Sequence, residues 1–391
     1  MGIYSEYLDK RFVGFEELTV ERKKQLKRLT EILGGDILVY ASDLKKGKQD
    51  ISISYPDILP FTDQLSNMSG QRLFFILETP GGLGEIAEQI VNLIRDKYKH
   101  VSIIVPGTAK SAGTIIAMSG DEILMEPSAS ALGPIDAQLN WNGKWFSAEA
   151  LISGFEKIKH EVEQSGQLNK AYILMLQGVS PGDLEHARNA LQFSKELVQN
   201  WLVKYKFKDW VKHRTEGKET FGKEVTGAEK ITRAREIAEE LCNHSRWRTH
   251  GRSISIRDLR AMGLEILDYS GNGELTDAIR RYYTLLQMMF DSTGIYKIFE
   301  TPTSQIYRFI RPEIATKPTN AAAKSAIVDI KCNKCDNETK IQANFEKDIP
   351  IEKGASPFPS DNKFKCSKCG QETDMSGIRQ EIEMAARKKI L

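Results

Sequence analysis

Two short, uninterrupted apolar runs, residues 73–77 and 101–105, stand out in the hydrophobic pattern of this chain. Runs of this length suit strands that are buried on both faces of a parallel sheet. Between them the apolar residues recur with the spacing of one helix face, at Ile86, Ile90, Val91 and Ile94. Strand, helix and strand in this order predict a βαβ unit. We therefore expect an α/β core.

The same pattern predicts further elements on both sides of this unit. Before it we expect an amphipathic helix over 15–33, a strand over 37–41 and a short helix around 57–65. After it we expect helices over 147–164, 169–176, 181–206 and 228–243, and then over 256–262 and 275–290. A short strand at 265–267 and a closing hairpin over 298–310 complete the prediction. The helices between about 139 and 243 form a layer appended to the α/β core.

Each central strand is followed by a turn of small residues. The first turn, 79–82, reads TPGG, and the second, 107–113, contains Ser111. Small residues permit sharp turns and let a substrate approach the backbone closely. Ligands of parallel sheets bind at the carboxyl ends of the strands, where both turns lie. The N–H groups of Gly82 and Ala112 are therefore predicted to form an oxyanion hole beside Ser111, with Gly81 in the same substrate-binding turn. A serine at a helix start has a simpler alternative role as an N-cap.

Length and charge narrow the class of protein. A chain of 391 residues is long enough for two or three domains and a large core. The formal net charge of +2 produces no global field that would favour nucleic acid or an anionic membrane. No apolar run reaches the roughly 18 residues that span a bilayer, and the N-terminus carries charges where a signal peptide is apolar. We expect a cytoplasmic protein without a membrane span.

Four of the five cysteines form two CxxC pairs, Cys332 with Cys335 and Cys366 with Cys369. Two such turns place four thiolates around one Zn²⁺, which suits one tetrahedral site better than a redox dithiol. The intervening residues alternate between apolar and polar, which predicts a hairpin between the two metal-binding turns. We expect a zinc ribbon over 328–391, folded by its metal and ending in a basic helix, after a linker over 312–327 that is rich in Pro, Ala, Thr and Lys.

The order of TPGG, helix, strand and serine-bearing turn resembles the Clp/crotonase fold, and more narrowly the serine peptidases related to Clp protease and signal peptide peptidase A. The stretch GTAKSAGTIIAMSGDEILMEPSASALGPIDAQ, together with the later HGR at 250–252, is similar to the SDH family (serine dehydrogenase proteinase). The resemblance covers about residues 15–290. It implies repeated ββα units with an appended helical layer in a domain over 1–311. It also implies a homo-oligomer, because relatives assemble as rings or stacked trimers.

The resemblance also implies a catalytic triad. Carried onto matching positions, it makes Ser111 the nucleophile, Asp136 in GPIDAQ the orienting carboxylate and His250 in HGR the base. A serine hydroxyl needs a histidine to take its proton, and a carboxylate fixes the tautomer of that histidine. His244, six residues before His250, competes for the role of base.

A serine–lysine dyad is the other mechanism among these relatives. Lys110 adjoins Ser111, but adjacent side chains on a turn diverge. Lys144 and Lys157 fall in the region where such a lysine arises, with no motif around them. The sequence therefore favours the triad.

The function we expect is a serine endopeptidase that forms an acyl-enzyme on Ser111 and acts on peptides or proteins. An acyl-CoA enzyme of the same fold would leave Ser111 without a role, and nothing else in the chain indicates coenzyme A. The competing class is a scaffold or adaptor whose zinc ribbon binds protein or nucleic acid. Lysines flank the metal-binding turns in a way that fits this class, at Lys331, Lys334, Lys365 and Lys368.

Overall fold

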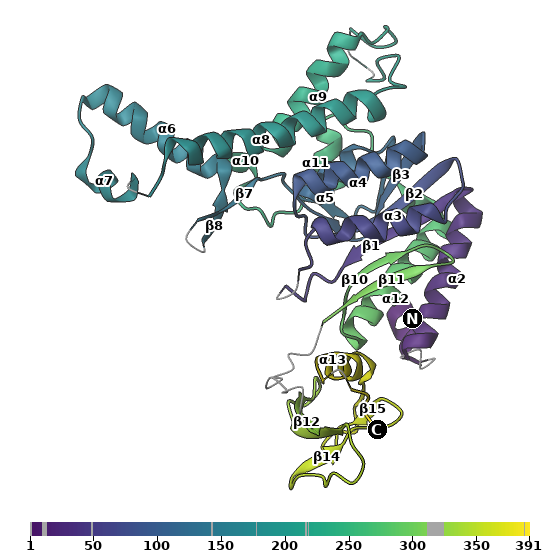
Figure 1. Cartoon of the computed structure of the whole chain (residues 1–391). Helices are drawn as coiled ribbons and strands as arrows, with labels where there is room; N and C mark the ends of the chain where they lie inside the picture. The colour runs from purple at the N-terminus through teal and green to yellow at the C-terminus, as the bar shows by residue number, and fades with distance from the viewer. Residues whose placement is uncertain are drawn as a thin grey trace. The chain divides into compact units, whose positions relative to one another are not determined.

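A computed structural model of the chain describes residues 2–9, 14–47, 50–141, 144–176, 178–215, 217, 219–310, 324–386 and 388–391. The chain divides into two compact units, Met1–Phe309 and Ile310–Leu391, shown in Figure 1. The predicted linker over 312–327 lies outside the described residues up to position 323. Its last three residues, from Ser325, belong to strand β12 (Ser325–Lys331).

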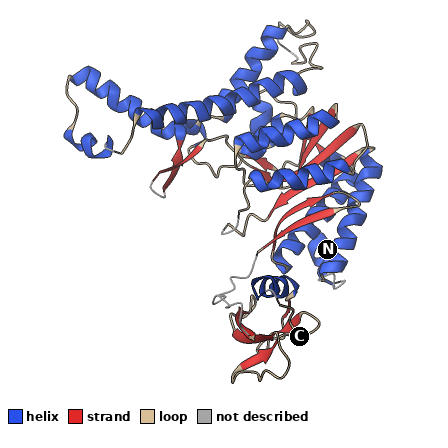
Figure 2. Ribbon diagram, in the orientation of Figure 1, coloured by secondary structure: helices blue, strands red, loops and turns tan. Residues whose placement is uncertain are grey.

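A seven-stranded sheet forms the centre of the first unit, with the order β11-β10-β1-β2-β3-β5-β9 (Figures 1 and 2). The parallel strands are β1 (Asp36–Ser42), β2 (Arg72–Glu78), β3 (His100–Val105), β5 (Glu122–Met125) and β9 (Leu267–Asp268). The predicted closing hairpin consists of β10 (Ile295–Glu300) and β11 (Gln305–Phe309), and β10 pairs antiparallel with β1. The βαβ reading of the central stretch is therefore confirmed.

Helices cover both faces of this sheet. One face packs on α3 (Ile58–Ser66), α4 (Gly84–Lys97) and α5 (Ala112–Met118), and the other on α2 (Phe15–Leu33) and α12 (Gly273–Ser292), with α1 (Ile3–Asp9) beside α12. Along β2, Leu73, Phe75 and Leu77 enter the first core, whereas Phe74 and Ile76 enter the second. Burial on both sides explains why the strand is a continuous apolar run in the sequence.

A second, smaller ladder crosses the carboxyl ends of the central strands. Its members are short: β4 (Thr108–Ala109) pairs in parallel with β6 (Ala131–Leu132). Isolated bridges extend the ladder on both sides, from Ile53 to Gly82, from Thr79 to Ala109 and from Leu132 to Ile254. The ladder therefore brings both glycine turns next to a segment from near residue 254.

The inserted layer begins with a hairpin, β7 (Gln138–Trp141) and β8 (Lys144–Ser147), and continues through α6 (Ala148–Ser165), α7 (Lys170–Leu176), α8 (Pro181–Trp201) and α9 (Gly227–Leu241). In Figure 1, α6 and α8 lie side by side. The single helix predicted over 181–206 changes to a π-helical turn, η2 (Leu202–Lys206), after Trp201. Then follow α10 (His244–Trp247), α11 (Ile256–Ala261) and η3 (Tyr269–Gly271). Of the helices described, none is both long and apolar enough to cross a bilayer.

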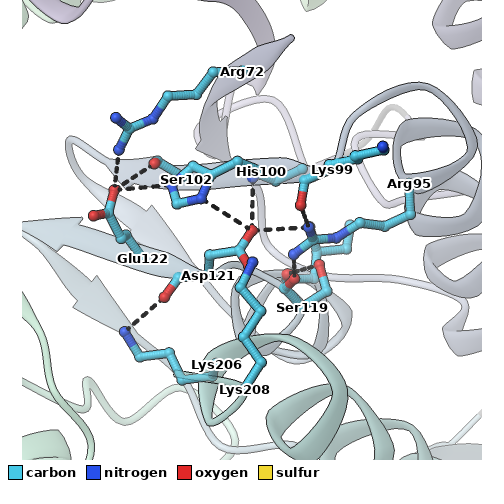
Figure 3. Close-up of polar contacts among 12 residues, drawn as sticks. Arg72, Arg95, Lys99, His100, Ser102, Ser119, Asp121, Glu122, Lys206 and Lys208 are labelled. Carbon is cyan, nitrogen blue, oxygen red and sulfur yellow. Dashed lines mark hydrogen bonds and ion pairs between the residues drawn. The ribbon is translucent and has the colours of Figure 1, made fainter. Parts of the chain in front are cut away.

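Asp121 connects the segment that follows α8 to the amino ends of β3 and β5, as Figure 3 shows. Its carboxylate accepts hydrogen bonds from Lys208 Nζ, from the N–H of Val101 at 2.7 Å and from Arg95 Nη1 at 2.8 Å. The Arg95 guanidinium lies 3.7 Å from the ring centroid of Tyr205. Burial alone would raise the pKa of Asp121, but these donors outweigh it and lower the pKa.

The second unit contains two hairpins and a helix. β12 pairs with β13 (Glu338–Asn344), which also pairs with β14 (Ala355–Pro357), and β15 (Lys363–Lys365) pairs with β16 (Glu372–Asp374). Helix α13 (Ser376–Ala386) packs its apolar residues on the first hairpin. The prediction of a hairpin between the two CxxC turns is wrong, because each CxxC turn is itself the tip of a hairpin. A CxxC turn reverses the chain, and the strands before and after it pair.

Candidate active site

Ser111 occupies a strained turn between β4 and α5. Its backbone has φ 49° and ψ −115°, a positive-φ conformation that non-glycine residues rarely adopt. Its side chain makes no capping hydrogen bond to α5, so the N-cap alternative does not account for this serine. Gly81 lies against it, since a Cβ at Gly81 would come within 2.6 Å of Ser111 Cβ. The serine therefore faces backbone that only a glycine can supply.

One predicted oxyanion donor, Gly82, lies on the ladder, and the other, Ala112, is the first residue of α5 directly after Ser111. The Ile53 N–H donates to Gly81 O at 2.7 Å, and the Leu83 N–H donates to Ile53 O at 2.9 Å. Gly82 lies between these two bonds, and in a parallel ladder such a residue points its own N–H away from the partner strand. Across the described part of the chain, the N–H groups of Gly82 and Ala112 have no acceptor. Both are therefore available to a substrate oxygen.

Asp136 is buried at the start of the inserted layer, with 4% of its surface exposed. Its carboxylate accepts hydrogen bonds from Ser147 Oγ and Gln138 Nε2, both at 2.6 Å. Burial would raise its pKa, but the donors and the two nearby histidines outweigh that effect and lower the pKa. This residue is held as a carboxylate in a buried position.

Both candidate histidines face Asp136. The Nδ1 atom of His244 lies 3.3 Å and that of His250 lies 3.7 Å from Asp136 Oδ2. The backbone N–H of His244 donates to the Glu149 carboxylate. His250 Nδ1 is buried and lacks a hydrogen-bond partner among the described residues. At 3.7 Å its contact with Asp136 is longer than a hydrogen bond, as in many catalytic pairs before substrate binds.

The segment that carries the histidines is attached to the serine turn. Lys110 Nζ donates to Gly251 O at 2.7 Å. Further along, Leu132 and Ile254 exchange two backbone hydrogen bonds, at 3.0 and 2.8 Å. The neighbour of Ser111 thus binds the neighbour of His250, although more than a hundred residues separate them in the chain.

The structure describes the side chains of two of the three candidate lysines of a dyad. Lys110 is engaged with the Gly251 carbonyl, and Lys157 is exposed on α6. The side chain of Lys144 lies outside the described residues.

Glu78, at the end of β2, connects the two glycine turns. Its carboxylate accepts the N–H of Thr108 at 2.7 Å and the hydroxyl of Tyr283 at 3.2 Å, and a Cβ at Gly107 would come within 2.6 Å of it. Burial raises its pKa to about 7 because these donors only partly replace water. Glu78 was not identified from the sequence. Its position at the end of an apolar strand is the one sequence feature that points to it.

Glu78 should therefore make stability depend on pH. The folded-state pKa of Glu78 is raised, so the free energy of unfolding falls as pH rises from about 4.5 to about 7. Glu78→Gln keeps the shape and removes the charge, so we expect it to be more stable than wild type at pH 8, by at most roughly 3 kcal/mol, and equal near pH 4.5. Urea unfolding at both pH values measures this. Glu85→Gln, on an exposed side chain of α4, is the control. A constant difference between Glu78→Gln and wild type would contradict the prediction.

The four paired cysteines meet at one point in the second unit. Their sulfur atoms all lie within 4.8 Å of one another. The Sγ atoms are 3.6 Å apart in Cys332 and Cys369, and 3.7 Å apart in Cys335 and Cys366. Zn–S bonds of about 2.3 Å place tetrahedral thiolates roughly 3.8 Å apart. The cluster therefore fits one metal ion.

Residues 68–232 match the family model of the ClpP-like SDH-type serine proteinases. The resemblance to the SDH family is confirmed. The matched segment contains Ser111, Asp136 and both glycine turns, and it ends before the two histidines. The α/β Clp-like fold class is confirmed with it, and the cysteine cluster fits the predicted zinc ribbon.

Two uncharacterized proteins of Methanocaldococcus jannaschii are similar to this chain. MJ1495 is 26% identical over 213 residues, which cover 54% of this chain and 55% of that protein. MJ0137 is 27% identical over 215 residues, covering 54% and 57%. The chain spans little more than half the length of these relatives.

Two solved structures of the 1510-N membrane-bound stomatin-specific protease also match. A serine-to-alanine mutant is 18% identical, with a TM-score of 0.32, over 58% of this chain and 79% of that one. A lysine-to-alanine mutant in complex with a substrate peptide is 16% identical, with a TM-score of 0.31, over 67% and 89%.

Proposed function

We propose that the first unit is a serine endopeptidase in which Ser111 is the nucleophile, His250 the general base and Asp136 the residue that orients it. The family match supports a serine peptidase. The observation that carries the proposal is the attachment of the histidine segment: Lys110 binds Gly251, while His250 Nδ1 faces the buried carboxylate of Asp136.

The chemistry follows from this arrangement. With Nδ1 turned toward Asp136, Nε2 of His250 takes the proton of the Ser111 hydroxyl as its oxygen attacks a peptide carbonyl. The N–H groups of Gly82 and Ala112 stabilise the oxyanion of the tetrahedral intermediate. His250 then gives the proton to the leaving amine, and water hydrolyses the acyl-enzyme by the same route.

His250 is preferred to His244 although His244 lies nearer to Asp136. The backbone next to His250 is bound by the neighbour of Ser111. The backbone of His244 is held instead by Glu149, on helix α6 of the inserted layer. We infer that His244 supports the carboxylate rather than the serine.

A fluorophosphonate probe tests the proposal. We expect it to phosphonylate the wild type at Ser111, as located by peptide mass spectrometry. His250→Ala should slow phosphonylation about 10³-fold because the general base is lost. His244→Ala is the matched control and should slow it by less than about tenfold. Labelling at another residue would refute the proposal, and a larger loss in His244→Ala would exchange the roles of the two histidines.

We further propose that the cysteine cluster binds structural Zn²⁺ and that peptides or proteins are the substrates. Four thiolates with this spacing suit Zn²⁺ because it prefers tetrahedral sulfur ligands. The cytoplasmic location and the homo-oligomer stay predictions.

A further inference from the structure

Lys297 is a buried cation away from the serine and the histidines. It lies on β10 and pairs with Asp57 at the end of η1 (Tyr55–Asp57), with side-chain exposures of 2% and 1%. Its Nζ lies 3.0 and 2.9 Å from the two carboxylate oxygens of Asp57 and donates to Ser52 O at 2.6 Å. These acceptors satisfy the three N–H groups of an ammonium.

Asp57 holds the other side of the same segment. Its Oδ2 accepts the N–H of Ser54 at 3.0 Å and the hydroxyl of the buried Tyr40 at 3.0 Å. The ion pair therefore fixes the two residues that flank Ile53, Ser52 through Lys297 and Ser54 through Asp57.

Ile53 forms the backbone hydrogen bonds that hold the first glycine turn. It receives Leu83 N–H and donates to Gly81 O, and a Cβ at Gly82 would lie only 2.2 Å from Ile53 O. With contacts this close on both sides, a shift of Ile53 moves the N–H of Gly82.

A buried ion pair is a weak source of stability, because apolar residues of similar volume often do as well. We propose that Lys297 and Asp57 are positioning residues for the oxyanion hole, acting through Ile53 on the N–H of Gly82. The inference rests on the proposed function and names residues that set the geometry of that same site.

A pair of double variants tests this inference. Lys297→Met with Asp57→Asn removes both charges together and leaves neither one unpaired. Arg22→Met with Glu300→Gln is the matched control. That pair is equally buried, at 0% and 0%, and Glu300 shares β10 with Lys297, but the pair joins β10 to α2 rather than to the 52–54 segment. Tyr40→Phe removes a single hydrogen bond to Asp57 and is the milder variant.

The readouts are the phosphonylation constants and hydrogen exchange in the full chain. In the test variant we expect the maximal rate of phosphonylation to fall about 10- to 100-fold, with little change in probe affinity. Exchange at the N–H groups of Ile53 and Leu83 should become faster. The control should keep the wild-type phosphonylation constants and exchange rates, and Tyr40→Phe should show the same changes as the test variant at smaller size.

Equal phosphonylation rates in the test and control variants, or unchanged exchange at Ile53 and Leu83 in the test variant, would overturn the inference. The proposed function would still stand in that case, provided that the wild type is labelled at Ser111. A wild type that is not labelled at Ser111 would overturn both.

Discussion

Ser111→Ala is expected to lower peptide hydrolysis about 10⁶-fold in kcat, with little change in KM, because the nucleophile acts only in the chemical steps. The strained turn and the free N–H groups of Gly82 and Ala112 would remain. The variant should therefore still bind peptide and keep the small residual catalysis that an oxyanion hole provides.

Digestion of fluorescein-labelled casein, together with fluorophosphonate labelling, measures this loss. Ser119→Ala is the matched control. Ser119 lies at the other end of α5, and among the described residues its hydroxyl donates to the Ile116 carbonyl within the same segment. We expect this control to cleave and to be labelled like the wild type. Unchanged cleavage by Ser111→Ala would show that Ser111 is not the nucleophile, whereas a wild type that neither cleaves nor is labelled would favour the scaffold or adaptor class.

The central α/β core could be predicted because its signals are local. The run 73–77 is apolar at every position since β2 is buried on both faces, and 15–33 has the periodicity of one buried helix face. The small ladder could not be predicted in this way. Its strands are one or two residues long, and its bridges join Ile53, Gly82 and Ile254 from distant parts of the chain. Segments this short have no period of their own.

Local sequence patterns likewise predict one part of the candidate site and not the other. Ser111 and the glycine turns are visible in the sequence because small residues around a serine have a conformational reason to be there. Asp136 and His250 came only from the family resemblance, and no local pattern separates His250 from His244. The structure adds the contact of Lys110 with Gly251, which depends on how the inserted layer folds.

Glu78 and Lys297 were not identified from the sequence, for a different reason. Each is a charged residue within a strand, and apart from the position of Glu78 at the end of an apolar run the sequence gives no sign that either residue is buried. Their roles come from backbone groups, the N–H of Thr108 for Glu78 and the carbonyl of Ser52 for Lys297. Backbone partners leave no trace in a single sequence, because every residue type carries them.

Removal of the proposed zinc ion from the second unit is expected to unfold that unit and leave the first one folded. The hydrophobic core of the second unit is small, and four thiolates that share one ion would link its two hairpins. The first unit has its own two cores on the faces of the seven-stranded sheet. A chelator such as EDTA, or Cys366→Ser, should therefore expose 324–391 to limited proteolysis while cleavage within 14–309 stays as in the untreated chain.

The fifth cysteine provides the control for this experiment. Cys242 is buried in the first unit and is not a member of the four-cysteine cluster, and burial raises its pKa to about 12. Cys242→Ser should leave the zinc content at one ion per chain, measured by a colorimetric zinc assay after denaturation, whereas Cys366→Ser should lose it. Fluorophosphonate labelling of Ser111 should persist after chelation, because zinc takes no part in the proposed acyl transfer. A second unit that resists proteolysis without its metal would show that its hydrophobic core suffices for folding. A loss of Ser111 labelling on chelation would show that the metal does affect the reaction of the serine.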